Sequence, residues 1–362
     1  MRSMLRLKWV LVTLCVMLTA CAAPQKARER FFWPAPPDIP RVEWLGFYQD
    51  KGQLTAPGLF AEVLGEDLGI TLGFPVFAAG DGMGRLYVSD HKLAGVMVFD
   101  FPAKTVRMLG AKDLQEGFHR PTGIGFDADG NIYVGDTERK KIYVFTKEEK
   151  LASVLDLSKE LKSIGFFAVD KMRKRLIIPD IQSHAIVISD LGGKVLTSFG
   201  KRGPGEGELN FPSSVALDPQ GNIVVCDQMN ARIETFTPDG VFKAKFGKRG
   251  DGVGEFNIIK AVAVDSEGHV YVTDGRGSKL SLFNDAGEIL LQVGGPSSEK
   301  GGATVTAGGF NFPNGVFIDQ NDTIYVADVF NRRVQMFQYL NEKYLREHPV
   351  QSPAEPAAAV KP

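Results

Sequence analysis

Short apolar segments recur along the chain in a fixed order, separated by polar turns. In one repeat the run "GIGF" (123–126) precedes an Asp-x-x-Gly turn, "NIYV" (131–134) follows it, and "IYVF" (142–145) comes after an Asp and a short loop. These runs are too short for helices and are rich in β-branched and aromatic residues, so each is predicted to be a β-strand. A weaker fourth run, such as "FKAKFG" (242–247), completes most repeats.

The repeat occurs six times, and each copy has an Asp at the end of its second strand. These closing aspartates are spaced by 44 to 54 residues and are Asp90, Asp136, Asp180, Asp227, Asp274 and Asp328. A self-similar period of this length is typical of repeat architectures. Four strands per repeat, with no long helical pattern between them, predict an all-β fold: a six-bladed β-propeller of four-stranded antiparallel blades.

The last repeat lacks a clear fourth strand, whereas "VEWLGF" (42–47) near the N-terminus belongs to no repeat. A ring left open would expose long sheet edges, which proteins avoid. We therefore expect residues 42–47 to complete the last blade and close the ring. The alternative is that "KYLREH" (343–348) supplies this strand.

The segment 199–240 resembles an NHL repeat, a family of propeller blades. It has a Gly-rich loop, a Phe-Pro entry to the first strand, an Asp-x-x-Gly turn, and Asp227 followed by Asn230 and Arg232. The resemblance covers roughly residues 73–340 and implies the propeller fold.

The third repeat departs from the NHL pattern. Its turn lacks Gly, and Pro179 precedes a closing aspartate, Asp180, that is displaced by one residue. A β-bulge would account for this displacement.

The chain is predicted to divide into a lipoprotein signal peptide (1–20), a tether (21–40), an NHL-type propeller (41–345) and a disordered tail (346–362). A basic start, a short apolar core and small residues before Cys21 resemble the lipobox of bacterial lipoproteins. The resemblance implies that Cys21 is the lipidation site. It also implies a lipid-anchored protein of the bacterial cell envelope, on the outer membrane and facing the periplasm.

Charge and cysteine content agree with an exported protein. The chain has 42 Lys and Arg against 43 Asp and Glu, and the predicted signal removes three cations and no anions. An acidic remainder argues against a nucleic-acid partner. Of the three cysteines, only Cys226 would remain as a thiol, and its apolar strand predicts a buried, inert side chain.

The turn "DADGN" places Asp127, Asp129 and Asn131 in the alternation of a calcium loop. Such a loop needs Gly at its sixth position, where this chain has Ile132 at the start of a strand. The segment is therefore predicted to be a turn whose Asp bonds to its own backbone.

Catalytic signatures are weak. Some enzymes with NHL-like propellers, the amidating lyases, hold zinc through histidines at the central channel, and His91, His119 and His184 are expected to share one face here. No short ligand spacing supports a common metal ion, and no nucleophile elbow is present. We expect a non-catalytic protein without a cofactor. A metal-dependent lyase or hydrolase with a site at the channel mouth is the alternative. A small-molecule sensor is a third possibility, which no feature of the sequence distinguishes.

The expected function is binding of a protein partner in the cell envelope. The N-terminal lipid is expected to anchor the protein to the membrane. The expected surface comprises the loops between blades and the loops after the second strands. Its candidate residues are His119, Arg120, Lys201, Arg202, Gln228, Asn230, Lys248, Arg249, Phe330 and Asn331.

Four closing aspartates are followed five residues later by a cation. These pairs are Asp136 with Lys141, Asp227 with Arg232, Asp274 with Lys279, and Asp328 with Arg333. Across a hairpin, such pairs are predicted to stabilise the blades.

Overall fold

The computed structural model describes residues 30–54, 69–114, 116–297 and 306–349. The chain forms two units, Met1–Phe31 and Phe32–Pro362, and the second holds the propeller. The predicted signal peptide, Cys21, the tether before residue 30 and the tail from residue 350 lie outside the described residues. Within the described ranges, no helix has the length and apolar character needed to cross a membrane.

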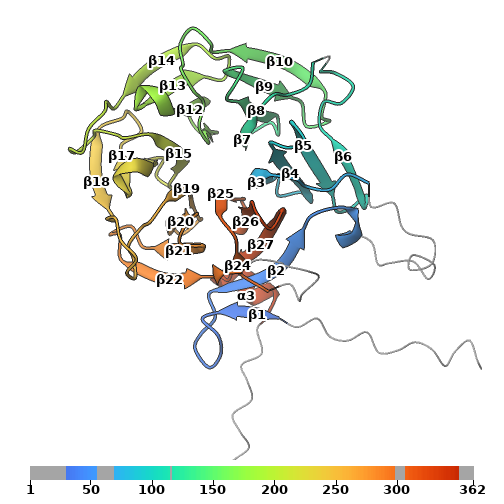
Figure 1. Cartoon of the computed structure of the whole chain (residues 1–362), viewed down its shortest axis with the longest axis vertical. Coiled ribbons are helices and arrows are strands. Elements are labelled where there is room, and N and C mark those ends of the chain that lie inside the picture. The colour runs from blue at the N-terminus through green and yellow to red at the C-terminus, as the bar shows by residue number, and fades with distance from the viewer. Residues whose placement is uncertain (1–29, 55–68, 115, 298–305, 350–362) are drawn as a thin grey trace, which may run out of the picture. The chain divides into compact units, whose positions relative to one another are not determined.

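Six antiparallel sheets are arranged around a central axis, which confirms the predicted propeller (Figure 1). Five of them have four strands, and the last has a fifth strand added at its outer edge. The blades in chain order are β3 (Pro75–Gly80), β4 (Arg85–Asp90), β5 (Gly95–Asp100) and β6 (Thr105–Met108); β7 (Pro121–Phe126), β8 (Ile132–Asp136), β9 (Lys141–Phe145) and β10 (Leu151–Asp156); β11 (Ala168–Asp170), β12 (Arg175–Asp180), β13 (Ala185–Asp190) and β14 (Val195–Phe199); β15 (Pro212–Leu217), β16 (Ile223–Asp227), β17 (Arg232–Phe236) and β18 (Phe242–Phe246); β19 (Ile259–Val264), β20 (Val270–Asp274), β21 (Lys279–Phe283) and β22 (Ile289–Val293); and β25 (Pro313–Ile318), β26 (Thr323–Asp328), β27 (Arg333–Tyr339) and β2 (Val42–Tyr48). Short elements between or beside them are η1 (Lys51–Gln53), η2 (Ile181–Ser183), η3 (Gln228–Asn230), β23 (Gly295–Pro296) and β24 (Gly309–Phe310).

The N-terminal strand β2 closes the ring, as expected. It pairs antiparallel with β27, with Val42 opposite Tyr339 and Trp44 opposite Phe337. A further strand, β1 (Phe31–Trp33), covers the outer edge of β2. The alternative closing segment instead forms a short helix, α3 (Glu342–Glu347).

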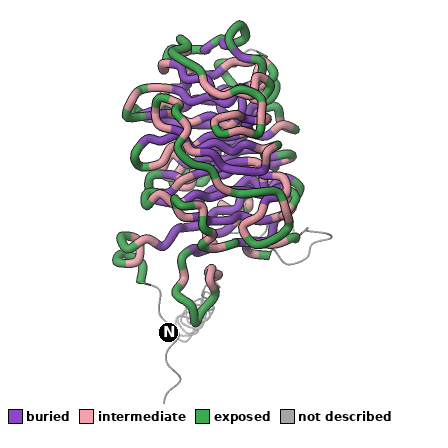
Figure 2. Tube along the Cα trace, turned by 90° about the vertical axis from the view of Figure 1, so that its left-hand side faces the viewer, coloured by how far each residue is buried: buried purple, intermediate pink, exposed green. Residues whose placement is uncertain are grey.

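The apolar pattern of the strands follows their position in the blade. The first three strands of most blades are largely buried, whereas fourth strands such as β14 and β18 are mostly exposed. Figure 2 shows the buried residues gathered inside the unit and the exposed ones at its loops. Apolar side chains of neighbouring blades pack together, as Val134 and Val98 do in one cluster. Burial between blades is the main term that holds such a ring together.

The predicted Asp-x-x-Gly turns are confirmed in detail. In the second blade, Oδ1 of Asp127 accepts hydrogen bonds from the amides of Asp129 and Asn131, both at 2.9 Å. Gly130 has a φ of 83°, which an L side chain rarely adopts. Since the Asp127 carboxylate is used by the turn and by the hydroxyl of Tyr133, the turn needs no metal ion.

In the third blade, the one-residue displacement of Asp180 arises in the turn between the first and second strands. Strand β12 pairs with β11 and β13 without a register shift, so the expected bulge at Pro179 is absent. The turn after Asp170 is instead one residue longer than its counterparts, and Lys174 takes a φ of 52° in place of Gly. The first strand of this blade, β11, is correspondingly short.

Candidate functional site

The antiparallel topology gives the propeller two structurally distinct faces. One, the loop face, carries the loops between second and third strands, which are residues 91–94, 137–140, 181–184, 228–231, 275–278 and 329–332. The loops that lead into the first strands emerge on this same face. The other, the turn face, carries the turns between first and second strands.

The closing aspartates hold the loop face together. Asp227 accepts hydrogen bonds from the amide of Asn210 (2.6 Å), Nδ2 of Asn230 (2.7 Å) and Nε of Arg232 (2.8 Å). Every other blade repeats the backbone contact: Asp90 with Gly73 and Phe74, Asp136 with His119 and Arg120, Asp180 with Lys162 and Ser163, Asp274 with Asn257 and Ile258, and Asp328 with Asn311. These acids therefore fix the loop that enters their own blade.

The predicted acid–base pairs form where the cation is Arg. Arg232 and Arg333 each place Nε 2.8 Å from the closing aspartate of their blade. Lys141 lies instead 3.6 Å from Asp156, and Nζ of Lys279 donates to the carbonyl of Glu255. The planar guanidinium can donate hydrogen bonds to the carboxylate and to loop carbonyls at the same time. The lysine ammonium is instead a single point charge on a flexible stem.

The candidate binding residues lie on the loop face, but not all are accessible. His119, Arg120, Lys201, Arg202, Lys248, Arg249 and Phe330 are exposed, and Gln228 and Asn230 are half-buried. Lys201 and Lys248 form ion pairs within their own loops, with Glu208 and Glu255.

Asn331 differs from the expectation, because its side chain is buried. Its Nδ2 donates to Oδ2 of Asp328 (2.8 Å) and to the carbonyl of Ser297 (3.0 Å). Asn230 makes the equivalent bonds to Asp227 and Gly203 in the fourth blade. Both asparagines therefore hold the loops of their own blades in place.

The three candidate metal-binding histidines do not come together. No group of three or more His, Cys, Asp or Glu side chains is placed to hold a metal ion in the described ranges. His91 stacks on Phe74, and its Nε2 is buried. Nδ1 of His184 accepts the amide hydrogen of Phe211. Burial lowers the pKa of both His91 and His184, so both imidazoles are neutral at neutral pH.

An aromatic cluster crosses the loop face between the last blade and the first. The Phe330 ring centroid lies 6.0 Å from that of Phe74 and 5.3 Å from that of Phe312, and Nζ of Lys260 lies 5.1 Å from the Phe312 ring centre. Phe330 is 54% exposed and Phe74 is 37% exposed. We call Phe74, Phe312 and Phe330 the aromatic cluster. From the sequence only Phe330 was singled out, although Phe74 and Phe312 share a signal, since each directly precedes the proline that starts a first strand.

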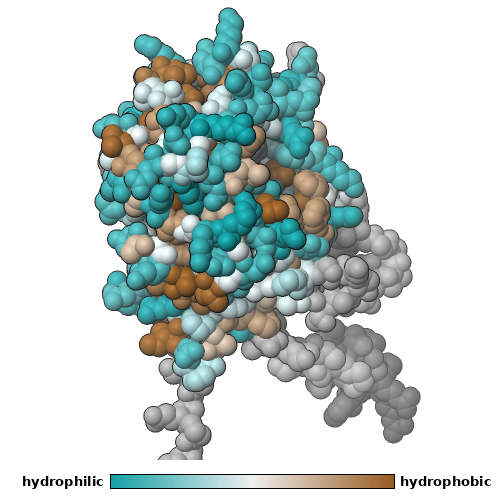
Figure 3. All heavy atoms as spheres, turned by 60° about the vertical axis from the view of Figure 1, so that its left-hand side comes forward, coloured by the Kyte–Doolittle hydropathy of each residue, from teal (hydrophilic) through white to brown (hydrophobic). Residues whose placement is uncertain are grey.

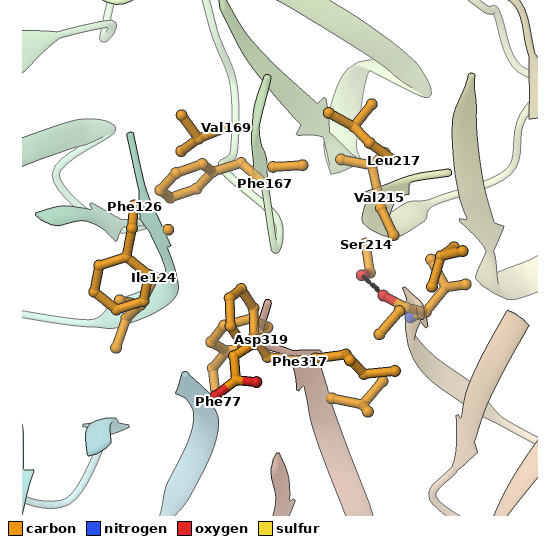
Figure 4. Close-up of a pocket in the computed structure, with 18 of the residues that line it drawn as sticks. Phe77, Ile124, Phe126, Phe167, Val169, Ser214, Val215, Leu217, Phe317 and Asp319 are labelled. Carbon is orange, nitrogen blue, oxygen red and sulfur yellow. Dashed lines mark hydrogen bonds between the residues drawn. The ribbon is translucent and has the colours of Figure 1, made fainter. Parts of the chain in front are cut away.

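A cavity of about 210 Å³ occupies the centre of the ring, and sequence reasoning missed it. Its walls come from the first strands of all six blades, and Figure 4 shows apolar side chains on every side. The lining continues to the turns at Asp81, Lys171 and Gln320, which places it toward the turn face.

A buried acid beside Asp227 has a shifted pKa. Oε1 of Glu234 lies 3.0 Å from Nη2 of Arg232, and the Glu234 side chain is fully buried. Burial raises the pKa of Glu234 to about 7 despite the nearby guanidinium. Burial likewise raises the pKa of Asp227, so this group of acids is proton-sensitive.

Cys226 is buried, as its sequence context predicted. Burial raises the pKa of its thiol to about 12, and the Ser213 hydroxyl donates to Sγ at 3.3 Å. A thiol in this state is a poor nucleophile.

Comparisons with known proteins support the architecture. A family model described as a 6-bladed beta-propeller matches residues 215–291. Over 175 residues, 46% of this chain, the sequence is 34% identical to the E3 ubiquitin-protein ligase TRIM71 of Rattus norvegicus. The similarity to this relative is NHL-like, in agreement with the repeat pattern, but the match spans only 18% of its length.

Solved structures share the fold at low sequence identity. An auxiliary nutrient binding protein from Bacteroides thetaiotaomicron aligns with a TM-score of 0.57 and 14% identity, covering 75% of this chain and 70% of that one. A virginiamycin B lyase from Staphylococcus aureus aligns with a TM-score of 0.54 and 13% identity, covering 74% and 95%. Since the same fold occurs in a binding protein and in an enzyme, the fold alone does not decide the function.

Proposed function

We propose that this protein is a lipid-anchored scaffold of the bacterial cell envelope that binds an acidic protein partner through its loop face and does no chemistry itself. The observation that carries the proposal is the aromatic cluster, an exposed apolar patch bordered by basic loops.

The aromatic cluster has the properties of a binding anchor. Exposed apolar side chains that gather in one place mark interaction sites more often than scattered ones do. Figure 3 shows one side of the molecule, where hydrophilic residues dominate and the hydrophobic residues form small, separate patches. The cluster rings contact one another, and Phe74 and Phe312 lie directly before first strands, so a partner would order few side chains on binding.

The charge around the cluster favours an acidic partner. The loops between second and third strands carry the cations Lys92, Arg139, Lys140, Arg276 and Arg332 and one acid, Glu138. His119, Arg120 and Arg202 lie exposed on the same face. The excess of cations in the loops between second and third strands, on a chain of net charge −1, would attract and orient acidic surfaces.

The place of action follows from the N-terminal sequence. Acylation at Cys21 after removal of residues 1–20 would anchor the protein, and residues 21–40 would connect it to the propeller. On the outer membrane the propeller would then face the periplasm, where its partner would be another envelope protein.

The test is site-specific photo-cross-linking in intact envelopes, with the photoreactive residue at Phe330 or at Met172. Met172 is the matched control, since it is 77% exposed but lies in a turn-face turn. We expect a defined adduct with an acidic envelope protein only when the photoreactive residue is at position 330. This adduct is expected to disappear at high salt and in the Arg120→Glu variant. Equal adducts at both positions, or adducts only with lipids and abundant porins, would contradict the proposal.

A further inference from the structure

The proposed partner surface leaves the central cavity unused. The cavity walls are mainly apolar and include Phe77, Phe126, Phe167, Val169, Leu217 and Phe317. Figure 4 shows these side chains converging from different blades, with the oxygen atoms of Ser214 and Asp319 as sparse polar points. Concave, apolar sites with few polar groups are typical of small-molecule binding.

Phe166 narrows the central cavity on the side of the loop face. The amide of Phe166 donates to the carbonyl of Ser213 (2.9 Å), and the carbonyl of Phe166 accepts from Val215 (3.0 Å). This ties the chain before β11 directly to β15. The Phe166 ring lies 4.9 Å from that of Phe77 and packs against apolar clusters of the first two and the last two blades. A ligand would therefore enter from the turn face.

The acids at the turn-face rim are already engaged. Oδ2 of Asp81 lies 2.7 Å from Nε of Arg85. Asp319 is buried and accepts the hydroxyl of Tyr325 at 2.9 Å and two backbone amides. Both carboxylates are hydrogen-bonded within their own turns, and Asp81 is also paired with a cation.

The third blade changes the charge of the rim. Residues 171–174 read Lys-Met-Arg-Lys, whereas the residues that follow the leading Asp in the other turns are neutral, as in Gly82-Met83-Gly84, or include one acid, as in Ala128-Asp129-Gly130. Lys171 lines the cavity and is exposed, and it has no ion-pair partner in the part of the chain that the structure describes. The departure of this repeat from the Asp-x-x-Gly pattern thus places an ammonium group at the mouth of an apolar pocket.

We propose that the cavity binds a small free carboxylate with an apolar chain. The chain fills the space between the first strands, and the carboxylate lies at the mouth against Lys171. Apolar contact supplies most of the affinity, because burying each methylene contributes about 0.8 kcal/mol. The ion pair at the exposed rim fixes the orientation and contributes less.

The test is titration calorimetry of the purified mature protein with octanoate, below its micelle concentration, and with octanol as the uncharged analogue. The variants are Lys171→Gln at the mouth, Val169→Trp and Leu217→Trp as fillers of the cavity, and Val154→Trp as a matched control on the exposed strand β10. Thermal melting by circular dichroism checks that each variant folds.

We expect octanoate to bind the native protein and Val154→Trp equally, at one site. Lys171→Gln is expected to weaken the affinity for octanoate about three- to fivefold and to leave the affinity for octanol unchanged. A folded filling variant is expected to bind both ligands at least about tenfold more weakly. Absence of octanoate binding, binding unchanged by a folded filling variant, or binding indifferent to Lys171→Gln would each overturn the proposal. None of these outcomes bears on the loop-face partner.

Discussion

Nε of Arg333 lies 2.8 Å from Oδ2 of Asp328, and both side chains are almost completely buried. The same guanidinium donates through Nη2 to the carbonyl of Gly309 (2.7 Å). One side chain thus joins the third strand of the last blade, the closing aspartate of its second strand and the loop that enters its first strand. This is the blade that β2 completes, so the ion pair stabilises the junction at which the ring closes.

Arg333→Ala is expected to destabilise the propeller by about 3–5 kcal/mol, because it leaves the Asp328 carboxylate buried without its cation. Chemical denaturation of the purified protein measures this loss.

Lys141→Ala is the matched control, because Lys141 has the same place in the second blade but pairs with the exposed Asp156. It is expected to cost less than about 1 kcal/mol. Equal losses at positions 333 and 141 would show that the buried pair has no special role.

Glu234 makes the stability of the fourth blade depend on pH. Its pKa in the folded protein, about 7, is above the ordinary value of 4.5, so the folded state binds the proton more tightly. The stability that this group contributes is complete below about pH 4.5 and is lost as the pH rises through about 7.

Glu234→Gln is expected to remove this pH dependence and to stabilise the protein by about 1–3 kcal/mol at pH 8. The last blade supports this expectation, because Gln335 occupies the equivalent position and donates to Asp328 at 3.1 Å. Thermal melts between pH 5 and pH 8 compare the two proteins. A melting temperature that falls equally in both over this range would rule out Glu234 as the titrating group.

Ring closure by β2 is expected to be essential for stability. Val42 is fully buried opposite Tyr339, so Val42→Asp would bury an unpaired carboxylate in the closing strand. We expect the free energy of unfolding to fall by at least about 3 kcal/mol, or the variant to fail to fold. Urea denaturation measures this loss. Val154→Asp on β10, where Val154 is 41% exposed, should stay within about 0.5 kcal/mol of the native protein. A stable, native-like Val42→Asp variant would contradict closure by this strand.

Chelation is expected to leave the propeller unchanged. His91, His119 and His184 are not gathered into a ligand set, and the turn carboxylates are bonded within their own turns. Melting temperature with and without EDTA, together with metal analysis, checks this expectation. Stoichiometric zinc that is lost in His119→Ala would favour the metal-dependent enzyme instead.

Local features were predictable from sequence. The Asp127 turn needs only an Asp, a Gly and four neighbouring amides or side chains, and the whole pattern lies within seven residues of the chain. Repetition of such turns gave the number of blades. Closure by residues 42–47 followed from the shortage of one strand in the last repeat, since sheet edges need partners.

Features that depend on several blades were not predictable. Phe166 joins β15 and packs toward the opposite blades, which no local pattern indicates. The aromatic cluster unites residues from the first and last blades, far apart in the chain. Asn331 looked like an exposed loop residue, but the loop folds its amide inward to bond Asp328, so its burial depends on the tertiary fold.

The loop face is proposed to bind an acidic protein through the aromatic cluster. The most direct measurement is the affinity of the cross-linked partner for the Phe330→Ala variant, with Met172→Ala as the control. We predict that Phe330→Ala weakens binding by about 2 kcal/mol, roughly thirtyfold, and that Met172→Ala leaves it unchanged. An affinity that is unaffected by Phe330→Ala, or reduced equally by both substitutions, would contradict the account.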